Sequence, residues 1–142
     1  MSAYVPANLR QQVHDCFSNC CAYCQTAEAL TVATFEIEHI IPRSSGGETI
    51  FANLCLSCST CNRCKADRTA AIDPVTQQEF PLYRPHHDDW SAHFAWSEDA
   101  TEIVASTPTG RATIVALRMN RPQLVRRRRM WTAMGEHPPK VE

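Results

Sequence analysis

A carboxylate and an imidazole stand side by side in the segment FEIEHIIPRSSGG, which runs from Phe35 to Gly47. Glu38 carries a hard oxygen donor suited to a divalent ion, and His39 carries a group that can accept a proton near neutral pH. Such a pair could activate water. A histidine in a strand is, however, more often a satisfied structural residue, so the pair has to be judged with its neighbours.

Eight cysteines surround this segment, in a chain without a secretory signal. Free thiols in a reducing compartment favour metal ligation over a disulfide framework. The two CxxC knuckles Cys21-x-x-Cys24 and Cys58-x-x-Cys61 could supply four thiolates to one tetrahedral Zn²⁺, closing the site and making it structural. Spacing alone leaves the register open, because Cys55-x-x-Cys58 and Cys61-x-x-Cys64 have the same form.

Two amides complete the constellation. Asn53 lies between the knuckles, and Asn62 directly follows Cys61, with Lys65 three residues later. Either asparagine alone would be interpreted as a turn or cap residue. The order C-x-x-C, EHIIP, GG, NL, C-x-x-CN, x-x-K resembles the HNH endonuclease family, and it is their joint order that makes the match specific.

The resemblance implies a ββα-metal fold and a role for each motif residue. His39 corresponds to the general base, Asn53 to the central asparagine that positions a loop, and Asn62 to the last motif position, so the chain is similar to an HNN variant. Glu38, in a position where the family more often has Asp, would hold the catalytic Mg²⁺ or Mn²⁺ together with Asn62. The resemblance also selects the zinc ligands, which are Cys21, Cys24, Cys58 and Cys61.

The elements that must position these residues indicate an α+β fold. The pattern predicts a helix over 7–17, a strand over 35–41, a loop at 44–47 and a helix over 59–70. Glu38 and His39 point to opposite faces of an ideal strand, so a bulge or strand end is needed to bring both to one site.

The C-terminal half is expected to add a β-hairpin, over 92–96 and 103–106, and two helices, one starting at the Thr-Pro of TPTGRAT and one capped by Asn120. Its segments IDP, PLYRP, WSAHF, TPTGRAT and LRMNRP resemble the C-terminal region of a bacterial HNH subfamily. We therefore predict a nuclease core over 1–74 and an extension over 75–142, packed as one domain. The segment that contains His86, His87 and His93 is expected to pack Trp90, Phe94 and Trp96 over the core rather than to bind a second metal.

The charge of the chain is unevenly distributed. Residues 103–135 contain seven arginines and no acid, although the net charge of the whole chain is −1. A basic block of this kind favours a polyanion, although a solvated helix face is the alternative interpretation. We expect DNA as the partner, duplex rather than single-stranded. The predicted phosphate contacts are Arg43, Lys65, Arg126, Arg127, Arg128 and Arg129.

The size of the chain and its hydropathy limit the class of protein. At 142 residues with 44% hydrophobic residues, it is long enough for a modest folded core. No apolar run approaches the length of a membrane span, which predicts a soluble, cytoplasmic protein. The leading hypothesis is a zinc-stapled, metal-dependent endonuclease; the alternatives are an inactive zinc-stabilised nucleic-acid-binding module and a redox or metal-storage protein.

Overall fold

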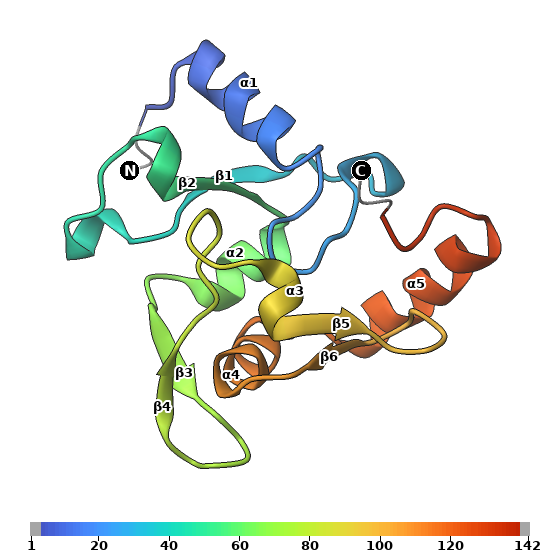
Figure 1. The fold of residues 1–142 in the computed structure, drawn as a ribbon. Coiled ribbons are helices and arrows are strands. Elements are labelled where there is room, and N and C mark those ends of the chain that lie inside the picture. Colours follow the sequence, from blue (N-terminus) through green and yellow to red (C-terminus); the bar gives the residue numbers. More distant parts are fainter. Residues whose placement is uncertain (1–3, 140–142) are drawn as a thin grey trace. The chain divides into compact units, whose positions relative to one another are not determined.

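The structure, a computed structural model, describes residues 4–139 (Figure 1). The chain forms two compact units that are not continuous in sequence. The first unit takes the residues up to Thr69 together with Arg84–His87, and the second takes Ala70–Tyr83 and the residues from Asp88 onward. No helix in the described part of the chain is long and apolar enough to cross a membrane.

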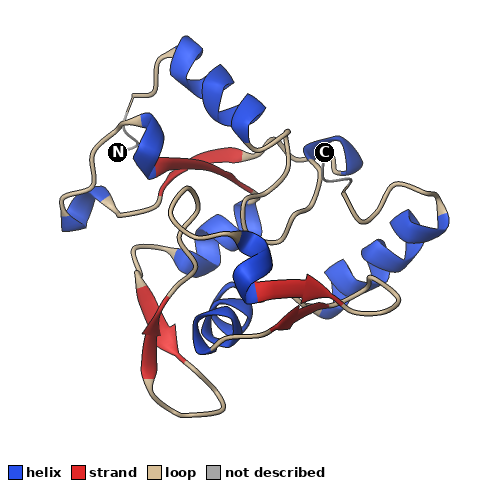
Figure 2. Ribbon diagram, viewed as in Figure 1, coloured by secondary structure: helices blue, strands red, loops and turns tan. Residues whose placement is uncertain are grey.

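The first unit is built around a β-hairpin and a helix (Figure 2). Strand β1 (Glu36–His39) pairs antiparallel with β2 (Leu54–Ser57), and α2 (Ser59–Lys65) follows directly. Cys58 is the N-cap of α2, and Ala66 ends the helix at a φ of 52°, earlier than the predicted residue 70. The predicted ββα core and mixed α+β class are therefore present.

Helix α1 (Ala7–Cys16) precedes this core, close to its predicted range. Its Val13 is fully buried, and the interior of the unit is completed by apolar side chains from both knuckles and both strands. These include Tyr23, Phe35, Ile40, Leu54 and Leu56. Short 3₁₀ turns at Glu28–Leu30, Arg43–Ser45 and Phe51–Asn53 complete the connections.

The second unit contains two hairpins and three helices. Strand β3 (Ala70–Ile72) pairs with β4 (Glu79–Pro81), and β5 (Phe94–Trp96) pairs with β6 (Ile103–Ala105). The helices are α3 (Trp90–His93), α4 (Pro108–Leu117) and α5 (Pro122–Ala133). The β5–β6 hairpin and the two last helices match the prediction, whereas the first hairpin was not predicted from its turn-rich sequence.

Helix starts in this unit follow local chemistry. The Thr107 hydroxyl accepts a hydrogen bond from Gly110 N at 2.9 Å and Pro108 opens α4, as Thr-Pro predicts. The prediction that Asn120 caps α5 is wrong, because Arg121 occupies that position. The Asn120 amide instead accepts from Ile103 N at 2.8 Å and donates to Ile103 O at 2.7 Å, joining this connection to β6.

Candidate functional site

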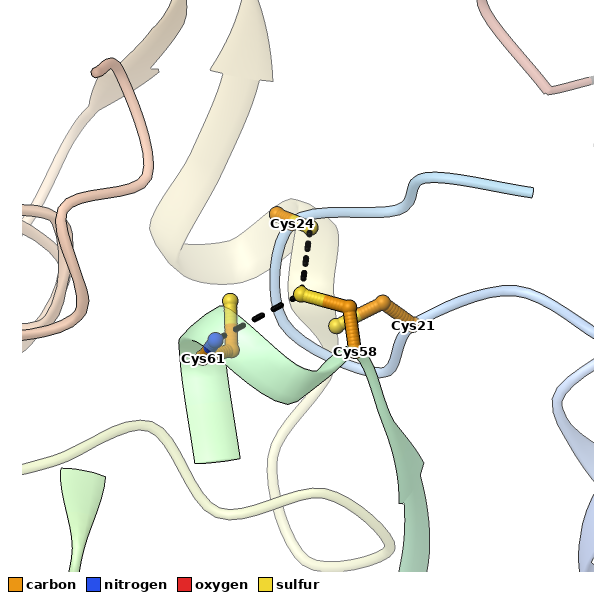
Figure 3. A group of neighbouring side chains, drawn as sticks. All are labelled: Cys21, Cys24, Cys58 and Cys61. Carbon is orange, nitrogen blue, oxygen red and sulfur yellow. Dashed lines mark hydrogen bonds between the residues drawn. The ribbon is translucent and has the colours of Figure 1, made fainter. Parts of the chain in front are cut away.

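Four of the eight cysteines gather at one point of the first unit. The sulfurs of Cys21, Cys24, Cys58 and Cys61 all lie within 4.8 Å of one another, and all four residues are buried. Figure 3 shows two of them on the loop after α1 and two at the start of α2, with their sulfurs facing a common centre. These are the four cysteines that the family resemblance implied as zinc ligands, and Cys55 and Cys64 lie outside the cluster.

The geometry of this cluster fits a tetrahedral zinc ion. Four sulfurs at about 2.3 Å from one ion lie about 3.8 Å apart, and Cys24 Sγ is 3.8 Å from Cys58 Sγ. Contacts with the neighbouring sulfurs hold the pKa of Cys24 well below its usual value, while burial raises the pKa of Cys21. Backbone N–H of Cys61 donates to Cys58 Sγ at 3.4 Å. The cluster is closed, as in a structural site.

The strand that carries the Glu-His pair is regular. Glu38 is opposite Cys55 and His39 is opposite Leu54, without a bulge. The two side chains therefore point to opposite faces of β1, and the bulge needed to bring them together is not there.

Glu38 lies in the interior instead of beside Asn62. Its carboxylate is 4% exposed, Oε1 lies 2.7 Å from Lys65 Nζ, and Oε2 accepts from Cys55 Sγ at 3.5 Å. Burial raises the pKa of Glu38, and the Lys65 ammonium opposes this rise. Glu38 and Asn62, the two residues predicted to share one divalent ion, line the same groove. The Glu38 carboxylate is engaged by Lys65 and Cys55, however, and Asn62 contacts Glu36 instead.

Lys65 is likewise internal. Its side chain is 2% exposed, and Nζ donates to Ile40 O at 3.0 Å in addition to the Glu38 pair. These contacts of the ammonium hold α2 against the end of β1. A phosphate therefore cannot reach it without breaking a buried ion pair.

Glu36 takes the place expected for Glu38. Side chains two apart on a strand share a face, so Glu36 and Glu38 both face α2. Asn62 Nδ2 donates to Glu36 Oε2 at 2.6 Å, one helical turn from Lys65. Two contacts thus join β1 to α2: Glu36 with Asn62 at the surface, and Glu38 with Lys65 in the interior.

His39 closes β1 and is half-buried. Its Nε2 lies 2.9 Å from Thr49 Oγ1, a residue of the loop between the strands. Burial lowers the pKa of His39, and the positive charges of Arg43 and Lys65 lower it further. The lowered pKa favours the neutral imidazole, the form that can accept a proton, and the Thr49 contact orients the ring.

Asn53 holds the loop that follows His39. Its Oδ1 accepts from Ile41 N at 2.8 Å, and its Nδ2 donates to the carbonyls of Ile41 and Glu48 at 3.1 and 2.9 Å. Gly47 lies against this arrangement, since a Cβ there would be 1.7 Å from Ile41 O and 2.9 Å from Asn53 Nδ2. The amide and the missing side chain together shape the loop.

A groove of about 440 Å³ runs along this part of the first unit. Its lining includes His39, the two carboxylates Glu36 and Glu38, Asn62, and the two arginines Arg10 and Arg43. The groove thus combines an imidazole, three side chains with hard oxygen donors, of which Glu38 is paired with Lys65, and two guanidinium groups. This set can bind a phosphodiester and a divalent ion while a water is deprotonated.

The groove also contains residues that the motif did not reveal. Arg10 comes from α1, and Glu36 lies two residues before the Glu-His pair. Thr49, the contact of His39, lies in the loop and outside the lining of the groove. Strand alternation could have indicated Glu36, because it puts 36 and 38 on one face. No local signal identifies Arg10, whose position depends on how α1 packs.

The arginine run of α5 divides into two kinds. Arg126, Arg127 and Arg129 are exposed. Arg128 is 1% exposed, with its guanidinium 5.2 Å from the Trp96 ring centroid and donating to Met119 O at 2.7 Å. Of the four arginines in this run that were predicted to contact phosphate, Arg128 is therefore internal and the other three are accessible.

Comparison with known proteins gives one match. Residues 21–68 match the family model described as HNH endonuclease, about a third of the chain. The matched segment contains both knuckles, β1, β2 and α2. The chain matches no curated protein and no solved structure.

Proposed function

We propose, from the premise that residues 21–68 belong to the HNH endonuclease family, that the protein is a metal-dependent endonuclease hydrolysing DNA phosphodiester bonds. The observation that carries this proposal is the groove beside β1. A neutral, oriented His39 lines the same groove as the Glu36–Asn62 pair and two arginines. Deprotonation of the attacking water and neutralisation of the phosphate charge each have a suited side chain there.

His39 is the proposed general base. It takes a proton from the attacking water, and its lowered pKa keeps the imidazole free to do so. The Thr49 hydroxyl limits rotation of the ring. Asn53 acts indirectly, because its three backbone contacts hold the loop that carries Thr49.

Glu36 and Asn62 are the proposed ligands of the catalytic Mg²⁺ or Mn²⁺. A divalent ion bound there would neutralise charge that develops on the phosphate. Glu38, which the sequence favoured for this role, could reach the ion only by leaving Lys65. We assign Glu38 to the buried pair that orients α2.

Arginines account for substrate affinity. Arg10 and Arg43 line the groove and would neutralise the phosphates next to the scissile bond. Arg126, Arg127 and Arg129 would add contacts to the backbone of duplex DNA from the second unit. Such contacts give affinity without sequence choice, and binding weakens steeply with salt.

The cysteine cluster is proposed to hold a structural zinc ion. Its four ligands come from the loop after α1 and from the junction of β2 and α2. A core of this size gains much of its stability from such a link. The ion would link α2, the helix that carries Asn62, to the segment that precedes β1.

Plasmid nicking tests the enzyme proposal. Purified protein is incubated with supercoiled plasmid and Mg²⁺ or Mn²⁺, and His39→Ala is compared with wild type. His87→Ala is the matched control, because His87 is an exposed histidine outside the groove. We expect His39→Ala to lose about 10²-fold or more of the rate. Equal rates with both metals would favour the alternative, a nucleic-acid-binding module that does not cut.

The metal assignment is tested with Glu36→Gln and Glu38→Gln. Glu36→Gln is expected to weaken Mn²⁺ binding, measured by titration calorimetry, without lowering the unfolding temperature. Glu38→Gln leaves a buried ammonium unpaired and is expected to cost about 3–5 kcal/mol of stability. The double variant Glu38→Gln with Lys65→Met removes both charges and restores folding. If that double variant folds but no longer binds Mn²⁺, while Glu36→Gln still does, Glu38 is the ligand.

A further inference from the structure

Four residues of the first unit come from beyond the matched segment. Arg84–His87 belong to the first unit, although Tyr83 before them and Asp88 after them belong to the second. The segment forms a tight turn, with His87 N donating to Arg84 O at 3.1 Å and with Pro85 buried. The chain thus enters the first unit for these four residues and then goes back to the second unit. Their contacts in the first unit therefore need an explanation.

His86 makes the contacts of this segment. Its Nε2 lies 2.7 Å from Leu54 O, within hydrogen-bond distance. Its ring lies 4.8 Å from that of Phe51 and 5.1 Å from that of Phe17, both measured between centroids. His86 has a φ of 73°, a backbone conformation that an L residue rarely adopts without compensation. The hydrogen bond and the two aromatic contacts supply that compensation.

These contacts meet the part of the hairpin that carries the proposed base. Leu54 is the register partner of His39, so its carbonyl lies on the residue directly opposite the base. Phe51 opens the 3₁₀ turn that ends at Asn53. Asn53 O accepts from Ile40 N at 2.8 Å, next to His39. A single imidazole thus contacts both the 3₁₀ turn and the first residue of β2.

We infer that His86 is a positioning residue for His39: by its hydrogen bond to Leu54 O and its tilted ring contact with Phe51, it fixes the start of β2 and the turn that bears Asn53. The inference rests on the proposed role of His39 as base. His86 does not line the groove, so it acts through the hairpin and does not touch substrate. The nuclease unit therefore extends beyond residues 21–68 and includes a segment near residue 86.

Three variants of the full-length, zinc-loaded protein test this inference. His86→Ala removes the donor and the ring, His86→Gln keeps an N–H donor of similar reach, and His87→Ala is the matched control in the same turn. Nicking kinetics give kcat and KM at a temperature below unfolding. The NMR resonances of the His39 imidazole report its orientation independently of activity.

We expect His86→Ala to lower kcat about tenfold, since displacement of a catalytic group by less than 1 Å suffices for such a loss. KM should stay within about twofold, because the groove arginines are untouched. The His39 resonances should shift in His86→Ala, return toward wild type in His86→Gln and stay unchanged in His87→Ala. A lower unfolding temperature with unchanged kcat and unchanged His39 resonances would overturn the inference and leave His86 a purely stabilising residue.

Failure of the proposed function gives a different result. If wild-type protein does not cut DNA with either metal, the base assignment falls. The His39 resonances still decide whether His86 controls the geometry of that imidazole. The two outcomes are therefore distinguishable.

Discussion

Two adjacent glycines in the loop after β1 meet opposite surroundings. A Cβ on Gly46 would have no atom within 4 Å, and its φ of +89° is the only obstacle to a side chain. A Cβ on Gly47 would overlap Ile41 O at 1.7 Å. Position 47 thus requires glycine for space, whereas position 46 favours it for backbone conformation.

This contrast predicts different results from the same substitution. Gly46→Ala should cost about 1–2 kcal/mol of unfolding free energy through left-handed strain, with nicking within a few-fold of wild type. Gly47→Ala must displace Ile41 and the Asn53 amide, and should lower kcat by about 10²-fold. Urea unfolding and plasmid nicking measure the two quantities. Equal loss of activity in both variants would contradict the role given to the Asn53 contacts.

The order of residues in the sequence indicated the motif residues of the candidate site. The partners of Glu36, Glu38 and Lys65 became apparent only from their burial and contacts in the structure. His39, Asn53, Asn62 and the four clustered cysteines stand in the order that carries the family resemblance. The partners of Glu36 and Lys65 depend on how α2 packs along β1. Residues two apart on a strand are separated by about 6.7 Å and residues three apart on a helix by about 4.5 Å along the axis, and the sequence does not state which carboxylate meets which helix side chain.

At the scale of elements, the four consecutive arginines of α5 differ in burial: three are exposed and one is internal. Helical rotation by about 100° per residue leaves Arg126, Arg127 and Arg129 in solvent and turns Arg128 inward. Arg128 then binds the carbonyls of Thr101 and Met119. The basic run was visible in the sequence, but its division was not, because the interior partner comes from a distant hairpin.

Arg127→Ala and Arg128→Ala should therefore separate binding from stability. Arg127→Ala is expected to weaken duplex binding and to reduce the slope of log K against log salt by about one, with unchanged unfolding. Arg128→Ala should cost about 2–3 kcal/mol, because it leaves buried carbonyls without a donor. Fluorescence anisotropy of a labelled duplex and urea unfolding are the measurements. A loss of affinity confined to Arg128→Ala would show that the exposed arginines are a solvated face only.

At the scale of the whole molecule, the tryptophans and the clustered cysteines belong to different units. All three tryptophans, Trp90, Trp96 and Trp131, belong to the second unit, and the four clustered cysteines belong to the first. Tryptophan emission therefore reports on the second unit alone. The reactivity of the cysteine thiols reports on the first.

Removal of zinc should consequently affect the two units differently. With a strong chelator under reducing conditions, we expect the four cysteines to become reactive toward a thiol reagent and nicking to cease. Tryptophan emission should remain that of the folded second unit, and added Zn²⁺ should reverse the change. A red shift of the emission in the same step as thiol exposure would show that the two units unfold together.

The boundaries of the units were the least predictable feature at this scale. Hydrophobic periodicity and turn residues predicted the α+β class and the C-terminal hairpin and helices. Neither indicates that Arg84–His87 return to the first unit, because that return depends on the contacts of His86 with Leu54 and Phe51. Short segments fixed by distant partners have no periodic signal of their own.

The interrupted order of the first unit has a consequence for its biosynthesis. The last zinc ligand is Cys61, and the last segment of the unit ends at His87, after the whole β3–β4 hairpin. A chain synthesised from its N-terminus can gather its four thiolates around zinc well before His86 emerges. With the proposed zinc site and base, metal loading would precede completion of the hairpin that carries His39, and a nascent chain would bind zinc before it gains the geometry to cut.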